Sequence, residues 1–112
     1  MDRPAALHDE RLRRDGVRLL KSADDQRIRQ LREQVSDNDR ALIEAMNRRL
    51  ELVAKMWSYK RSRGVDVLDP EREEWMLRYL ARANRGPLSQ EGLEELFSTV
   101  LALTKRELSG GS

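Results

Sequence analysis

Apolar residues recur at alternating steps of three and four along residues 28–59. The positions of this seam are Ile28, Leu31, Val35, Asn38, Leu42, Ala45, Arg49, Leu52, Met56 and Tyr59. A repeat sustained over this length is typical of a helix that packs along one face. Ser22 and Asp25 fit a capping box at its start, and Gly64 fits a C-terminal stop. The pattern predicts one long helix that begins at Ser22 and ends just before Gly64.

Two shorter helices are expected after the long one. Asp69 and Pro70 are typical of an N-cap and a first helical residue, which predicts a helix from about 70 to 84. The run Asn84-Arg-Gly-Pro87 breaks it, and Ser89 can cap a third helix from about 90 to 108. The expected fold is therefore all-α, with three helices in the chain and the long one first.

The two ends of the chain lack a sustained pattern. Residues 1–21 mix charges of both signs with a proline and Gly16, and Ser109 to Ser112 is rich in glycine and serine. We expect a mobile or loosely docked leader over 1–21, one helical domain over 22–108, and a frayed tail over 109–112.

Composition excludes several classes of function. The 22 basic and 20 acidic residues leave a net charge of only +2, and aromatic residues make up 4% of the chain, which argues against a nucleic-acid-binding protein. There is no cysteine, and the one histidine, His8, lies in the leader, so neither a metal site nor a nucleophilic mechanism is supported. No segment resembles a signal peptide or a transmembrane helix, which favours a cytoplasmic protein.

The length of the first helix predicts a dimer. A helix over residues 23–62 is about 60 Å long at 1.5 Å per residue, and the two later helices are too short to cover it. Its apolar stripe is also broad, because Ile43, Met46, Leu50, Val53 and Trp57 lie beside the seam. An intertwined helical homodimer would bury this surface. The alternative is a monomeric three-helix bundle with a protruding end.

Several charged residues occupy positions where a core is expected. Arg49 lies on the seam, and Lys60, eleven residues later, returns to nearly the same face about 16 Å along the axis. Two such side chains can hold a small anion between them. Arg32 is seventeen residues before Arg49 and lies about 25 Å from it, so it can serve such a ligand only from a partner chain.

The later helices repeat this feature. Arg72 and Glu73 open the second helix on its apolar stripe, and Thr104 lies within the apolar row of the third. Each residue has a simpler explanation as a surface or ion-pairing group: Arg32 with Asp39 of a neighbour, Arg72 with Asp69, and Glu73 with Lys60. Taken together, charges on the stripes of three helices indicate a cavity for a small polyanion.

With these residues in place, the chain resembles the all-helical chorismate mutases. The resemblance covers about residues 28–108. It rests on Leu31-Arg-Glu-Gln-Val35, on Asn47-Arg-Arg-Leu-Glu-Leu52 followed by Lys60, and on Val67-Leu-Asp-Pro-Glu-Arg-Glu73. It implies conversion of chorismate to prephenate in phenylalanine and tyrosine biosynthesis, without a cofactor, in a homodimer whose two sites are each completed by the partner.

The resemblance also implies roles for particular residues. Arg49 and the partner chain's Arg32 would hold the two substrate carboxylates, Lys60 would donate to the ether oxygen, and Arg72 would bind a carboxylate. Asp69 and Glu73 would contact the ring hydroxyl, and Thr104 stands where the family usually has serine.

Leu108 departs from the family pattern. It stands where these enzymes usually carry glutamine or glutamate as a second donor to the ether oxygen. In this respect the chain is similar to short mutases that are weak alone and are activated by the first enzyme of the shikimate pathway. Three other functions stay open: an isochorismate-pyruvate lyase, an aminodeoxychorismate mutase, and a non-catalytic helical dimerisation module.

Overall fold

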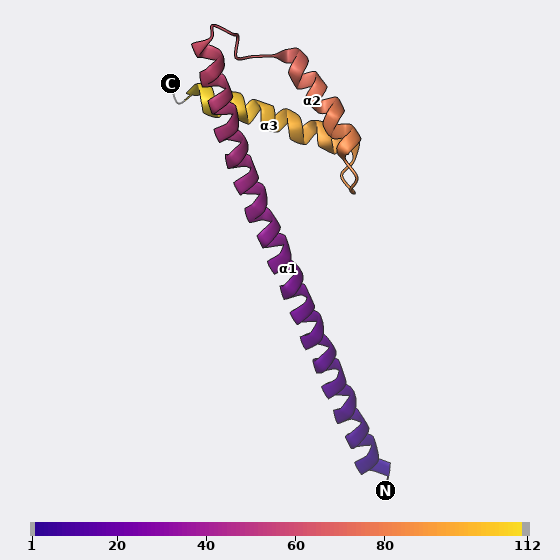
Figure 1. Ribbon diagram of the computed structural model, residues 1–112. Coiled ribbons are helices and arrows are strands. Elements are labelled where there is room, and N and C mark those ends of the chain that lie inside the picture. The colour runs from indigo at the N-terminus through magenta and orange to yellow at the C-terminus, as the bar shows by residue number, and fades with distance from the viewer. Residues whose placement is uncertain (1, 111–112) are drawn as a thin grey trace. The chain divides into compact units, whose positions relative to one another are not determined.

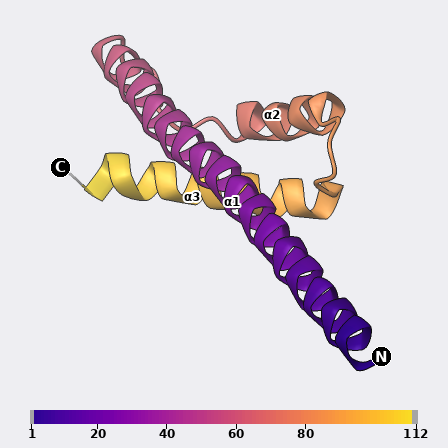
Figure 2. The same cartoon turned by 90° about the horizontal axis from the view of Figure 1, so that it is seen from below.

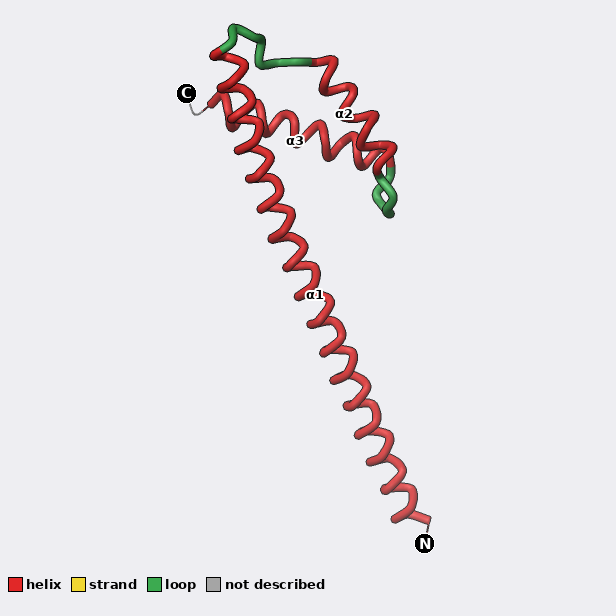
Figure 3. The backbone as a smooth tube through the Cα atoms, viewed as in Figure 1, coloured by secondary structure: helices red, strands yellow, loops and turns green. Residues whose placement is uncertain are grey.

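The computed structural model describes the backbone of residues 2–110 and the side chains of residues 22–109. It contains three helices, α1 (Asp2–Ser62), α2 (Pro70–Ala83) and α3 (Gln90–Gly110), in that order. Over the described backbone the rest is loop, without any strand (Figure 3). The prediction of an all-α, three-helix chain with the long helix first is confirmed.

The expected start of the long helix at Ser22 is wrong, because α1 begins at Asp2 and includes residues 2–21. The capping box at Ser22 is a local signal that the chain does not use. Pro4 falls in the first turn, where proline is tolerated, and Gly16 is a single weak position among good helix formers. Whether this leader is mobile or docked stays a prediction, since its side chains lie outside those described.

The end of α1 follows the predicted stop at Gly64. Gly64 adopts φ 68°, a left-handed conformation that glycine reaches without strain. The Val65 amide then donates to the Lys60 carbonyl over 2.8 Å, and the Gly64 amide donates to the Arg61 carbonyl over 3.1 Å. These bonds satisfy carbonyls that the helix end would otherwise leave unpaired. Lys60 is thereby placed in the last turn of α1.

The caps of α2 and α3 also follow the sequence. The Asp69 carboxylate accepts a hydrogen bond from the Arg72 amide at 3.1 Å, and the Ser89 hydroxyl accepts one from the Gly92 amide at 3.0 Å. Helix α2 ends at Ala83 with Asn84 as its C-cap. Helix α3 continues to Gly110, so it includes the first two residues of the expected tail, and the fraying of residues 109–112 stays a prediction. Residues 111 and 112 lie outside the described part of the chain.

The chain divides into two compact units, with the boundary between Glu44 and Ala45. In the first unit, every described side chain from Ser22 to Glu44 is exposed. This exposed set includes five large apolar residues on α1: Ile28, Leu31, Val35, Leu42 and Ile43. Such a stripe has no partner within the unit.

The second unit contains the end of α1 together with α2 and α3. Helix α3 lies across the C-terminal part of α1 (Figure 1), and α2 and α3 run in roughly opposite directions (Figure 2). Trp57 and Leu93 form the small apolar core, at 6% and 9% exposure, and Thr104 is buried at 4%. The buried Thr104 hydroxyl contacts Arg49 of α1 and Val100 of α3, so a polar group lies among the few buried residues of this unit.

No helix among residues 2–110 combines the length and the apolar character needed to span a membrane.

Candidate active site

The second unit contains a pocket of about 460 Å³ that is partly open to solvent, a volume that suits a small organic ligand. Its apolar wall includes Val53, Met56, Trp57, Val67, Met76 and Leu101. Its polar and charged lining comes from all three helices and from the residue that caps α2: Arg49, Lys60, Asp69, Arg72, Glu73, Thr104 and Lys105. Six of the residues predicted from the sequence therefore share one cavity: Arg49, Lys60, Asp69, Arg72, Glu73 and Thr104.

Two predicted site residues do not line this pocket. Arg32 belongs to the first unit, where its side chain is exposed. Leu108 is half-buried on α3, beyond the lining that this helix contributes through Leu101, Thr104 and Lys105. Helix α3 thus contributes Lys105 to the pocket lining, and residue 108 contributes no side chain to it.

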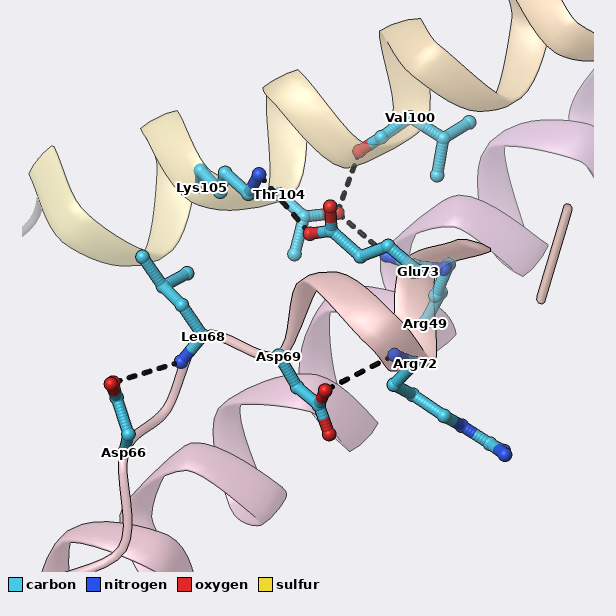
Figure 4. A network of polar contacts seen from close by, with 9 residues as sticks. All are labelled: Arg49, Asp66, Leu68, Asp69, Arg72, Glu73, Val100, Thr104 and Lys105. Carbon is cyan, nitrogen blue, oxygen red and sulfur yellow. Dashed lines mark hydrogen bonds and ion pairs between the residues drawn. The ribbon is translucent and has the colours of Figure 1, made fainter. Parts of the chain in front are cut away.

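Arg49 is held by α3 from two directions. Its Nη1 donates to the Thr104 hydroxyl oxygen at 2.6 Å (Figure 4). Its guanidinium carbon lies 5.5 Å from the centre of the Phe97 ring. Thr104 in turn donates to the Val100 carbonyl at 2.7 Å, the usual bond of a threonine inside a helix. Because that bond uses its only proton, the Thr104 hydroxyl acts as an acceptor that orients Arg49.

Burial lowers the pKa of the Arg49 guanidinium, and the negative charge of Glu73 partly offsets this by raising it. The guanidinium stays protonated at neutral pH, because arginine loses its proton only at strongly basic pH. No carboxylate among the described residues lies within 4.0 Å of it. A half-buried cation without an ion-pair partner is costly, so it favours an anionic ligand in the pocket.

Lys60 and Asp69 line the pocket from two helix ends, the last turn of α1 and the N-cap of α2. Lys60 is half-buried in the last turn of α1, where the negative end of the helix dipole favours its charge. Asp69 is committed to capping α2 through its bond to the Arg72 amide. The sequence alternative in which Arg72 and Asp69 form an ion pair is wrong, since the contact with Asp69 uses the Arg72 backbone.

The Arg72 side chain points away from Glu73 and Thr104 (Figure 4). Its guanidinium carbon lies 4.2 Å from the centre of the Trp75 ring, and Trp75 stacks on Tyr79 with ring centroids 5.3 Å apart. A cation at this distance over an indole is attracted to the ring face. The Arg72 guanidinium is therefore held on Trp75, although the residue also lines the pocket.

Glu73 pairs with Lys105 across the gap between α2 and α3, with Oε1 and Nζ 3.1 Å apart. The sequence alternative that paired Glu73 with Lys60 is wrong. Lys105 is also the charged lining residue that the sequence analysis missed, because it lies one step outside the apolar row of α3 that contains Leu101 and Thr104. Its position directly after Thr104 was the only available signal.

The chemistry of this lining is limited to charge and hydrogen bonding. Among the described residues no group of three histidine, cysteine, aspartate or glutamate side chains lies close enough to hold a metal ion. The pocket instead presents fixed cations on helices, joined to an apolar wall. This arrangement, in an all-helical protein, has the lining that a small anionic ligand requires.

The family to which the sequence belongs is consistent with a pocket of this kind. Residues 31–107 match the family model described as "Chorismate mutase type II". The chain belongs to this family, which confirms the resemblance found in the sequence. No curated protein sequence matches the chain.

Proposed function

We propose that the protein is a chorismate mutase that rearranges chorismate to prephenate for phenylalanine and tyrosine biosynthesis. The observation that carries the proposal is Arg49, a half-buried guanidinium that forms no ion pair with a carboxylate of residues 22–109 and that lines the same pocket as Lys60. Family membership supports a mutase activity in general, and the particular substrate is the proposal. Action in the cytoplasm is part of the same proposal.

In this proposal the cations of the pocket bind a dianion. Arg49 holds one carboxylate of chorismate, and Arg72 turns from Trp75 to bind a carboxylate. Lys60 donates to the ether oxygen of the breaking C–O bond. Asp69 and Glu73 contact the ring hydroxyl, while Thr104 keeps Arg49 in place.

The reaction needs no more than these groups supply. The rearrangement is intramolecular, so no nucleophile attacks and no proton has to be transferred. Rate enhancement comes from holding the side chain of the substrate over its ring and from stabilising the negative charge that grows on the ether oxygen. Cations carried on three helices are suited to both tasks.

A chorismate assay with identification of the product tests the proposal. A mutase converts chorismate to prephenate. Release of pyruvate from isochorismate would identify a lyase, and turnover of aminodeoxychorismate alone would identify the amino-specific mutase. A helical dimerisation module would consume none of these compounds and would not bind prephenate, which would overturn the proposal.

We also propose that the protein works as a homodimer with shared active sites. The support is the apolar stripe of α1 in the first unit, where Ile28, Leu31 and Val35 are exposed at 46%, 42% and 60%. A second copy of the chain can bury this stripe. In such a dimer the partner chain brings Arg32 to the pocket that contains Arg49.

Mixing two inactive variants tests the shared site. Arg32→Ala and Arg49→Ala homodimers should each have very low activity. After joint refolding, half of the dimers are mixed and carry one intact site of two, so about a quarter of wild-type activity should return. Native mass spectrometry confirms that mixed dimers have formed. If they have formed and the mixture stays inactive, the sites are not shared.

The family resemblance also implies an activating partner, the first enzyme of the shikimate pathway. The support for this proposal is Leu108, which offers no donor where related enzymes place one. Titrating that enzyme into the chorismate assay shows whether the rate rises.

A further inference from the structure

In the pocket, the Glu73 carboxylate pairs with Lys105 and not with Arg49. Arg49 is more buried than Lys105, and charges that are buried are usually paired. Glu73 is close enough to raise the pKa of Arg49, yet its carboxylate lies beside Lys105. Lys105 and Glu73 are 46% and 31% exposed in their side chains, so the pair that does form is the more solvated one.

Geometry explains how Lys105 competes for Glu73. The carboxylate of Glu73 extends from α2 towards α3, where Thr104 and Lys105 are adjacent in sequence (Figure 4). Arg49 reaches the same place from α1 and is bound there to Thr104 at 2.6 Å. The Glu73 carboxylate thus lies near two cations, and Lys105 holds its Oε1 at 3.1 Å.

We propose that Lys105 is a positioning residue that holds the Glu73 carboxylate away from Arg49 and so keeps the guanidinium free for an anionic group of the ligand. The identity of the ligand rests on the proposed function. The competition among Lys105, Glu73 and Arg49 is a property of the empty site and does not depend on it.

The consequence for affinity follows from population arithmetic. When an internal carboxylate occupies Arg49 for most of the time, only the remaining fraction of molecules can bind an anion, and the apparent Kd rises in proportion. If loss of Lys105 leaves Arg49 free in one molecule of ten, the ligand binds about tenfold more weakly. The internal carboxylate competes with the ligand without blocking the cavity.

The test is a double-mutant cycle with two measurements. Lys105→Met, Glu73→Gln and the double variant are compared with the wild type, with Lys105→Arg as the conservative variant. Lys55→Met is the matched control, because Lys55 is an exposed lysine on α1 outside the pocket lining. The first measurement is the Nε–Hε resonance of Arg49 in the ligand-free protein, assigned with Arg49→Lys. The second is the Kd for prephenate by calorimetry.

Lys105→Met should shift the Arg49 resonance and weaken prephenate binding about tenfold. In the Glu73→Gln background the same substitution should leave the Arg49 resonance unchanged and the Kd within about twofold, because no carboxylate remains to compete. Lys105→Arg should behave like the wild type. Circular dichroism confirms that each variant is helical. If Lys105→Met fails to fold, Lys105→Gln, which also removes the charge, is measured in the same two backgrounds and decides the matter.

Two results overturn the inference. An equal loss of affinity in both backgrounds means that Lys105 contacts the ligand or adds only its charge to the pocket. An unchanged Arg49 resonance in Lys105→Met means that Glu73 does not turn to Arg49. If the wild type fails to bind prephenate, the proposed function fails instead, and the resonance of the ligand-free protein still decides the role of Lys105.

Discussion

Arg49→Ala is expected to lower kcat/KM for chorismate by a factor of about thirty to a thousand while the protein stays helical. The loss of a charge-assisted contact to a substrate carboxylate in a partly desolvated site costs about 2–4 kcal/mol in the transition state. The substitution also leaves the buried Thr104 hydroxyl without the donor at 2.6 Å that it now accepts from. A modest loss of thermal stability should therefore accompany the loss of activity.

Arg48→Ala is the matched control for this prediction. Arg48 is the neighbouring arginine on α1, exposed to solvent and 3.5 Å from Glu51 in a surface ion pair. Exposed pairs of this kind contribute little to stability, so the Arg48→Ala protein should have the same activity as the wild type. Arg49→Lys should fall between the two, since lysine keeps the charge but loses the planar fork of donors. Near-normal kcat/KM in a folded Arg49→Ala protein would remove Arg49 from the site.

Lys60→Met is expected to lower kcat by about a hundredfold to a thousandfold with a much smaller change in KM. In the proposed reaction Lys60 meets the ether oxygen, where negative charge is small in bound chorismate and grows as the C–O bond breaks. An interaction that strengthens in the transition state appears in kcat, and removing such a donor typically costs this much. Methionine keeps a flexible apolar stem in a pocket whose wall also includes Val67 and Leu68.

Lys55→Met provides the corresponding control, because Lys55 carries the same charge on the exposed surface of α1. Steady-state kinetics on both variants separates kcat from KM. If Lys60→Met raises KM and leaves kcat unchanged, Lys60 binds a substrate carboxylate and the ether oxygen has another donor.

Helix boundaries show where sequence reasoning worked and where it did not. The stop at Gly64 and the cap at Asp69 were predicted correctly, because each depends on a backbone conformation or a side-chain acceptor encoded within a few residues. The start of α1 was predicted at the wrong place, because a capping box at Ser22 is equally compatible with a helix interior. A capping box marks the start of a helix only when the residues before it disfavour helix.

The residues of the pocket divide in the same way. Periodicity brought Arg49, Lys60, Arg72, Glu73 and Thr104 to attention, since charges on an apolar stripe are visible in the sequence, and all five line the cavity. The contacts between these residues were not predictable. Glu73 forms an ion pair with Lys105 instead of Lys60, and the Arg72 guanidinium lies over the Trp75 ring. Partner choice depends on distances between helices of a few ångströms, which spacing along one helix does not contain.

By itself, the sequence determined the helical class, the order of the three helices, the family and the set of cations that could serve an anion. These follow from local propensity, from periodicity and from motifs whose spacing is preserved along the chain. Only the tertiary structure decided that Thr104 orients Arg49, that Lys105 belongs to the pocket and that Leu108 does not line it. Those outcomes depend on how α3 crosses α1 and faces α2, and packing between helices sets that geometry through many weak contacts that no single stretch of sequence specifies.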